Sequence, residues 1–139
     1  MRSLLTAVAA TALLVTGCAD SGVTRARLEV AVQQTFDNLL AHQRDLLDGP
    51  PPSLSTVDCR RGVRGAGEEG PGDDWVCAIK TTDEVGAPKP VRLEVSVKPD
   101  GCFIAEGAPL VLGNRTLVLP DGSTVSNPVV SFDGCFDAR

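Results

Sequence analysis

Apolar residues between positions 24 and 47 recur mostly every three or four residues. They are Leu28, Val32, Phe36, Leu39, Leu40, Leu46 and Leu47. Such a stripe is typical of an amphipathic helix with one face on a core. Asp48-Gly49, with Gly49 as the expected left-handed residue, and the following Pro50-Pro51-Pro52 form a stop signal. We therefore expect one long helix over residues 24–47 that covers a sheet.

In the second half of the chain, apolar and polar residues alternate with a period of two. The alternation is clearest over residues 91–98, where Val and Leu alternate with polar residues. Pro-Asp-Gly occurs at 99–101 and again at 120–122 and is typical of turns between antiparallel neighbours. The residues from Arg60 to Asp74 are glycine-rich and predict an irregular stretch. The pattern predicts an α+β fold, with the helix packed on an antiparallel meander sheet of about five or six strands. The expected strands are 74–81, 90–98, 101–106, 115–119, 123–126 and 128–133.

The N-terminal residues have the layout of an export signal. Arg2 precedes an apolar run over residues 4–15, which is shorter than the roughly 20 residues that span a bilayer as a helix. The run ends in Leu14-Val15-Thr16-Gly17-Cys18, which resembles the lipobox of bacterial lipoprotein precursors. The resemblance implies cleavage between Gly17 and Cys18 by a type II signal peptidase and a diacylglyceryl group on the Cys18 thiol.

This resemblance divides the chain into a signal peptide (1–17), a lipidated tether (18–23) and one domain (24–139). It implies a partner, the membrane, and a location on the extracytoplasmic face of the cell membrane. An ordinary secretory signal with an unmodified Cys18 is the alternative, and in both cases the domain is exported. A helix beside a membrane can also lie on lipid, but the mixed charges of the polar face favour core packing.

The remaining cysteines are Cys59, Cys77, Cys102 and Cys135, an even number in an exported domain, which indicates disulfides. Of the three possible pairings we expect Cys59 with Cys77 and Cys102 with Cys135. These bonds close loops of 19 and 34 residues, both cysteines counted. No pair has the close spacing of zinc ligands, so no metal or cofactor is expected.

The formal net charge of -5 and the small number of aromatic residues argue against a nucleic-acid partner. Gly65-Ala66-Gly67-Glu68-Glu69-Gly70 matches a dinucleotide-binding pattern, but no apolar strand precedes it and no helix signal follows. His42, with Asp45 three residues on, is the only histidine available as a base. We interpret this pair as a helix-surface pair rather than part of a catalytic triad.

Charged residues of the glycine-rich stretch are weak candidates for a site. Its three arginines are candidates for binding an anion, and its four acids are candidates for binding calcium. However, both sets lie in one loop, and the acids lack the spacing of a calcium-binding loop. A self-compensating, solvated loop is the interpretation we favour. The charged residues are Arg60, Arg61, Arg64, Glu68, Glu69, Asp73 and Asp74.

Trp75, two residues before Cys77, is expected to pack against a disulfide.

The chain as a whole loosely resembles small cysteine-paired lipoproteins of unknown function from high-GC Gram-positive bacteria, and that resemblance supplies no catalytic residues. We predict a non-catalytic protein-binding or envelope-accessory module. The alternative is a carrier of a lipid or other apolar ligand, which an apolar cavity of several hundred Å³ between helix and sheet would favour. The third hypothesis, a hydrolase, needs converging acids, with the 60–74 loop as the first place to look.

Overall fold

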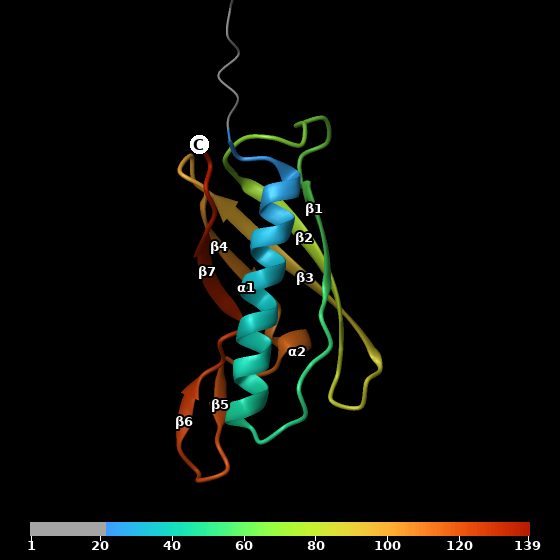
Figure 1. Cartoon of the computed structure of the whole chain (residues 1–139), viewed down its shortest axis with the longest axis vertical. Helices are drawn as coiled ribbons and strands as arrows, with labels where there is room; N and C mark the ends of the chain where they lie inside the picture. The colour runs from blue at the N-terminus through green and yellow to red at the C-terminus, as the bar shows by residue number, and fades with distance from the viewer. Residues whose placement is uncertain (1–21) are drawn as a thin grey trace, which may run out of the picture.

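The structure is a computed structural model that describes residues 22–139. A long helix, α1 (Arg25–Leu46), packs on an antiparallel sheet of five strands in the order β1-β2-β3-β4-β7 (Figure 1). The predicted signal peptide, the predicted lipidation site at Cys18 and most of the predicted tether lie outside the described residues. Within residues 22–139 no helix is both long and apolar enough to cross a bilayer. The strands are β1 (Thr56–Arg61), β2 (Gly72–Thr82), β3 (Pro88–Val97), β4 (Cys102–Gly107) and β7 (Ser131–Cys135).

Between β4 and β7 the chain makes a short helix, α2 (Pro109–Leu112), and a separate two-stranded hairpin of β5 (Thr116–Val118) and β6 (Thr124–Ser126). The mixed α+β class and the antiparallel sheet are thus as expected, and α1 and the six predicted strands lie close to their predicted positions. Three expectations about these elements were incomplete. The stretch predicted to be irregular, Arg60 to Asp74, includes the end of β1 and the start of β2. The predicted strands 115–119 and 123–126 do not join the main sheet, and β1 and α2 were not predicted at all. The single fully buried side chain of β1 is Cys59, so the strand carries too little apolar alternation to be seen in sequence.

Helix α1 begins and ends with side-chain and backbone caps. The Thr24 hydroxyl accepts a hydrogen bond from the Arg27 amide at 3.4 Å. At the other end the Gly49 amide donates to the Arg44 carbonyl at 2.8 Å, and the Asp48 amide donates to the Asp45 carbonyl. Asp48, not Gly49 as expected, takes the left-handed conformation, with φ of 52°. Aspartate tolerates this conformation because its short side chain makes local hydrogen bonds.

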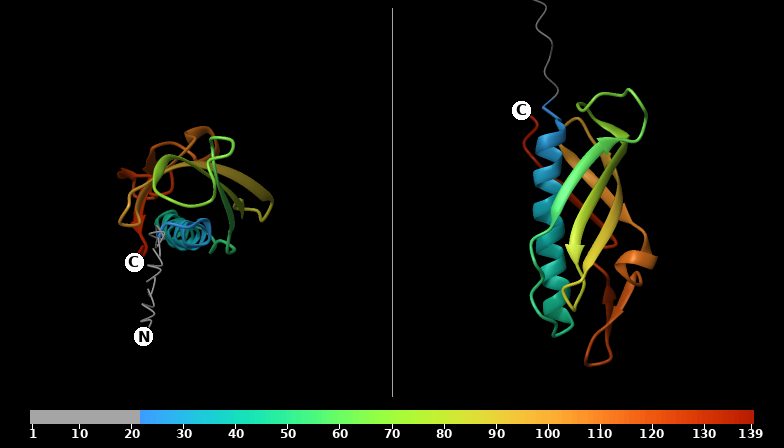
Figure 2. Two further views of the ribbon diagram at one scale, coloured as in Figure 1. Left: turned by 90° about the horizontal axis from the view of Figure 1, so that it is seen from above. Right: turned by 90° about the vertical axis from the view of Figure 1, so that its right-hand side faces the viewer.

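The sheet is one-sided, and α1 lies along its concave face (Figure 2). On β2 and β3 every second side chain is buried against the helix, and those between them face solvent or are half-buried. The α1 stripe completes this core with Leu28, Val32, Phe36 and Leu40. The inward residues of β2 and β3 are Trp75, Cys77, Ile79, Thr81, Val91, Leu93, Val95 and Val97.

Two Pro-Asp-Gly turns connect antiparallel neighbours, as predicted. Gly101 and Gly122 have φ of 85° and 84°, which glycine adopts without steric cost. In the β5–β6 turn the Asp121 carboxylate accepts hydrogen bonds from the hydroxyl and amide of Ser123, which lower the pKa of Asp121. The two turns therefore share their chemistry although only one belongs to the main sheet.

The two disulfides are the predicted pairs, and each joins residues that face each other on neighbouring strands. Cys59 on β1 pairs with Cys77 on β2, and Cys102 on β4 pairs with Cys135 on β7. They differ in exposure. Cys59 and Cys77 are completely buried beneath α1, whereas Cys102 is half-buried and Cys135 is exposed on the outer face of the sheet.

We predict that the two disulfides are reduced in order of exposure. When the native protein is titrated with a phosphine reductant and then alkylated, Cys102 and Cys135 should be modified at concentrations that leave Cys59 and Cys77 oxidised, because the reductant cannot reach a buried sulfur. Peptide mapping by mass spectrometry measures this. Simultaneous modification of both pairs in folded protein would contradict it.

Candidate functional site

The seam between helix and sheet is closed at one end and open at the other. Near the start of α1, Leu28 and Val32 are fully buried in the core. Near its end the sheet is one strand short. Strand β4 stops at Gly107, which pairs with Leu93, so residues 88–92 of β3 have no partner on that side. The chain turns into α2 at this point, and the missing stretch of strand leaves a cavity.

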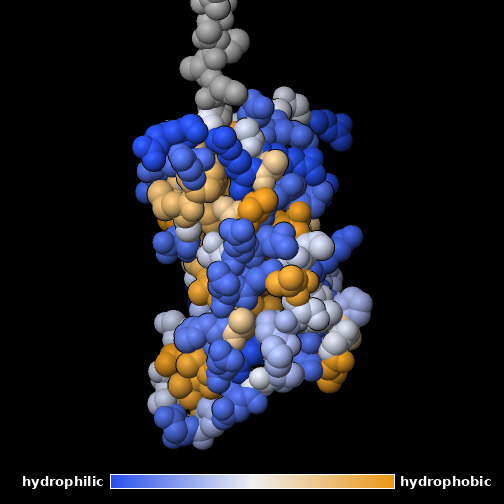
Figure 3. Space-filling model, viewed as in Figure 1, coloured by the Kyte–Doolittle hydropathy of each residue, from blue (hydrophilic) through white to orange (hydrophobic). Residues whose placement is uncertain are grey.

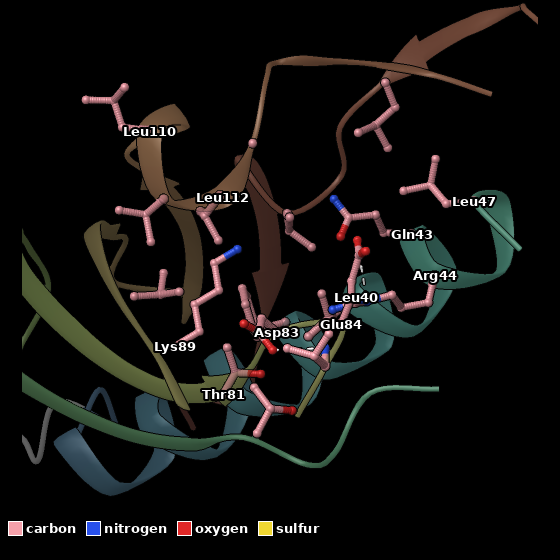
Figure 4. A pocket seen from close by; sticks show the side chains of 18 residues that line it. Leu40, Gln43, Arg44, Leu47, Thr81, Asp83, Glu84, Lys89, Leu110 and Leu112 are labelled. Carbon is pink, nitrogen blue, oxygen red and sulfur yellow. Dashed lines mark hydrogen bonds and ion pairs between the residues drawn. The ribbon is translucent and has the colours of Figure 1, made fainter. Parts of the chain in front are cut away.

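The cavity has a volume of about 530 Å³ and lies between the last turns of α1, the β2–β3 hairpin, α2 and β5 (Figure 4). Its volume is in the range of small-molecule pockets. Its floor is apolar and made of side chains that belong to the core itself. These floor residues are Phe36, Leu40, Val91, Leu112 and Val129.

Gly107 allows α2 to fold back tightly over the end of β4, and this packing forms one wall of the cavity. A Cβ atom on Gly107 would lie 2.3 Å from the Leu112 side chain and 2.9 Å from that of Leu93. Pro109 occupies the first turn of α2, and Gly113 ends it with φ of 94°. Leu112 is thereby placed over the end of β4, facing the cavity.

Two polar side chains of the cavity lining are buried without hydrogen-bond partners among the described residues. The Nε and Nη1 atoms of Arg44 are completely shielded from solvent and donate to nothing, and the Thr81 hydroxyl is likewise unpartnered. The Arg44 side chain is 8% exposed. A buried guanidinium with free donors is costly, because it has lost its water without gaining acceptors in exchange.

Arg44 makes one weak ion pair, with Glu84. Glu84 Oε1 lies 3.4 Å from Arg44 Nη1, an ion pair whose geometry does not make a hydrogen bond. Glu84 sits on the turn between β2 and β3, and its side chain is 74% exposed (Figure 4). Lys89 and Asp83 also line the cavity. Asp83 is occupied by its own turn, since its carboxylate accepts the amides of Val85 and Ala87.

Beside the cavity, a hydrogen bond between two buried side chains joins α1 to the segment between β6 and β7. The Gln43 side-chain amide donates to Asn127 Oδ1 at 2.7 Å, and both residues are buried. The Asn127 amide in turn donates to the carbonyls of Leu112 and Asn114. Asn127 therefore fastens α1 to the segment after α2, which holds the cavity walls at a fixed separation.

A second hollow lies between the first turns of α1 and the C-terminal segment, with a volume of about 650 Å³. It is larger but more open. Most of its lining is surface, including the exposed Arg27, Val30 and Gln34, and of its lining residues only Ala31 is buried. We therefore regard the cavity at Arg44 as the candidate site.

Three charged residues of the glycine-rich stretch, Arg61, Asp74 and Glu68, make structural contacts. Arg61 binds both carboxylate oxygens of Asp74 at 2.9 and 3.0 Å, donates to the Gly70 carbonyl and lies over the Trp75 ring. Glu68 binds Arg25 at 2.6 Å. Hydrogen bonds to Glu29 and then to Glu68 raise the pKa of Arg25 above its ordinary value.

The acids of this stretch do not gather into one site. Among residues 22–139 no three acidic, histidine or cysteine side chains converge as metal ligands, and none of residues 60–74 lines the cavity at Arg44. Arg60, Arg64, Glu69 and Asp73 are exposed. The predicted compensation within the loop is seen for Arg61 and Asp74, whereas Glu68 pairs with Arg25 of α1.

The other predicted residues lie away from the cavity at Arg44. His42 and Asp45 are both exposed on α1, and neither lines it. Trp75 is buried in the same core cluster as the Cys59–Cys77 disulfide, as expected, and its indole donates to the Gly70 carbonyl. Cys18 lies outside the described residues. Arg44, Thr81, Gln43 and Asn127 were missed by the sequence prediction. For Arg44 a signal existed, because residues 28, 32, 36, 40 and 44 follow one another at a spacing of four along the buried stripe.

Comparisons of the chain with protein-family models, with curated proteins and with solved structures found no match. The site must therefore be interpreted from its own chemistry.

Arg61 offers a test of the structural interpretation of the loop. We predict that Arg61→Gln lowers the free energy of unfolding by about 1.5–3 kcal/mol, because it removes charged hydrogen bonds to a half-buried acid. Denaturant unfolding with intact disulfides measures this. The control is Arg60→Gln, an exposed neighbour with the same charge change, which should stay within about 0.5 kcal/mol. Equal effects of both variants would contradict the assignment.

Proposed function

We propose that this protein is a non-catalytic, lipid-anchored binding protein of the extracytoplasmic face, and that its cavity at Arg44 holds a small apolar or partly apolar molecule. The observation that carries the proposal is the cavity itself, about 530 Å³ with a floor of core side chains. This is the feature that distinguishes a carrier from a purely protein-binding module with a close-packed seam. The carrier hypothesis, second in the sequence-based ranking, is therefore the one that the geometry favours.

The position of the cavity relative to the anchor bears on how a ligand arrives. The start of α1 lies toward one end of the molecule and its C-terminal turns toward the other (Figures 1 and 2). The helix of 22 residues is about 33 Å long. If Cys18 is held in the membrane, the short tether keeps the first turn of α1 near the lipid, and the cavity opens well away from it. A molecule that enters the cavity then comes from the aqueous side.

A protein-binding role is the second candidate, and exposed apolar side chains near the cavity favour it. Leu110 on α2 is fully exposed, and Val85 at the β2–β3 turn is 87% exposed. Both also line the cavity. Hydrophobic surface appears over the β2–β3 tip and over the β5–β6 hairpin (Figure 3). Such side chains serve as well for contact with a protein that delivers or removes a ligand.

We predict that a neutral apolar probe binds in the cavity. The mature lipoprotein in nanodiscs is irradiated with a diazirine derivative of octanol, and the labelled peptides are identified by mass spectrometry. Label should concentrate on peptides that contain Leu40, Val91 and Leu112, because their side chains form the apolar floor.

Val111→Trp tests whether the label depends on the cavity. Val111 lines the cavity and is partly exposed, so the larger ring can enter the empty space and should reduce labelling at least several-fold. Val118→Trp is the control, because Val118 is exposed on β5 and does not line the cavity. Label spread evenly over the surface of the wild-type protein, both for this probe and for its carboxylate analogue, would refute the carrier proposal and leave the protein-binding role as the better candidate.

The anchor has its own test. If Cys18 carries the lipid, Cys18→Ser should abolish both signal-peptide removal by the type II peptidase and acylation of the mature N-terminus, because serine lacks the thiol that forms the thioether. Intact mass spectrometry of wild type and variant measures cleavage and acyl mass together. A variant that is still cleaved before residue 18 and still membrane-bound as a mature protein would show that the anchor is wrong.

A further inference from the structure

We infer that the ligand of this cavity is amphipathic and that its oxyanionic head group, of the carboxylate type, is bound by Arg44. The inference rests on the proposed function and names the chemistry of the ligand. Its basis is the coexistence, in one cavity, of an apolar floor and a buried cation whose donors have no acceptor.

The first step concerns the guanidinium. Arg44 extends from the fifth position of the buried α1 stripe, where an apolar side chain would fill the cavity and add to the core. Two of its nitrogens, Nε and Nη1, are without hydrogen bonds and without solvent. A guanidinium presents its N–H groups in a planar fork that matches the two oxygens of a carboxylate. An oxyanion reaches these shielded donors only when the Glu84 carboxylate moves aside, and it then satisfies donors that the protein leaves without acceptors.

The second step concerns the existing counterion. Glu84 is the only acid that makes an ion pair with Arg44 among residues 22–139, and it does so at 3.4 Å without a hydrogen bond. The Glu84 carboxylate is mostly exposed, so water competes for it, and no hydrogen bond reinforces its attraction to Arg44. The Glu84 carboxylate is therefore a displaceable occupant of the position that a ligand oxyanion would take. Lys89, which also lines the cavity, adds positive charge that offsets Asp83.

The third step concerns selectivity. A neutral apolar molecule would fill the floor but leave the Arg44 donors and the Thr81 hydroxyl unpartnered. An acid of the same chain length would occupy the same floor and also supply acceptors. Sites with buried polar groups discriminate against ligands that leave those groups unpaired. The cavity should therefore prefer an alkyl carboxylate to the corresponding alcohol.

The experiment compares two photoreactive probes in the mature lipoprotein in nanodiscs at neutral pH, a diazirine derivative of octanoate and that of octanol. The quantity measured is the ratio of acid to alcohol labelling on cavity peptides, with each variant divided by wild type so that partitioning into the nanodisc cancels. Arg44→Gln should lower this ratio about tenfold, equivalent to about 1.4 kcal/mol. Arg92→Gln is the matched control, since Arg92 is exposed on the outer face of β3, and it should leave the ratio unchanged.

Glu84→Gln is the second variant, and it decides the matter if Arg44→Gln fails to fold, because Glu84 is exposed and outside the core. Removal of the competing carboxylate should raise the acid-to-alcohol ratio about threefold, because Glu84 is held by a single ion pair without a hydrogen bond and its own end of the pair is in solvent. Glu106→Gln, an exposed acid on β4 with the same charge change, should leave it at the wild-type value. Acetate should displace the octanoate probe far less effectively than octanoate itself, which separates an amphipathic ligand from a free anion.

The outcomes separate the two proposals. If both probes label the cavity equally and neither Arg44→Gln nor Glu84→Gln changes the ratio, Arg44 is a structural residue and the inference is wrong, while the carrier proposal stands. If acetate competes as well as octanoate, the site binds a simple anion and the inference of an amphipathic ligand is wrong. If neither probe labels the cavity, the proposed function and the inference both fail.

Discussion

The fold depends on one packing interaction, the burial of the α1 stripe against a sheet that has only one apolar face. The outer face of the sheet is polar or half-exposed, so the core exists only where α1 covers it. Caps fix where the helix begins and ends, and the buried Cys59–Cys77 disulfide holds β1, a strand with few apolar residues, in the sheet beneath it. The seam is closed where β4 extends the sheet beneath α1. It is open beyond Gly107, where β4 has ended and α1 continues.

The cavity is therefore a consequence of mismatched lengths rather than of a dedicated pocket motif. Strand β4 leaves the sheet at Gly107, five residues of β3 lose a neighbour, and α2 covers the gap only in part. The helix continues over this gap for its last turns, and there its buried stripe changes from apolar to charged at Arg44. An apolar floor beside a desolvated cation is the arrangement from which we argue for an amphipathic anion. The Gln43–Asn127 hydrogen bond ties the last turns of α1 to the segment before β7.

Much of the local structure could be predicted from the sequence because it is encoded by neighbouring residues. The helix is visible in the spacing of Leu28, Val32, Phe36 and Leu40, and β3 in strict alternation. The two Pro-Asp-Gly turns carry their own geometry, and the disulfides join cysteines adjacent in sequence order. Strand β1 was not predictable in this way, because its pairing is supplied by β2 and by the Cys59–Cys77 bond. The left-handed residue at the helix end was placed at Gly49 instead of Asp48, since the choice between adjacent residues depends on which amide reaches the Arg44 carbonyl.

The sequence alone predicted α1, six of the seven strands and the two cysteine pairs. It also predicted an exported, membrane-anchored domain, which follows from the residues around Cys18. Only the tertiary structure decided that β5 and β6 leave the main sheet and that one acid of the charged 60–74 loop pairs with α1. It also decided that Arg44, Thr81 and Leu112 line one cavity. The physical reason is the range of the interactions. Periodicity and turn chemistry act between residues a few positions apart, whereas a cavity is the space left over when segments distant in the chain have packed, and no local pattern records it.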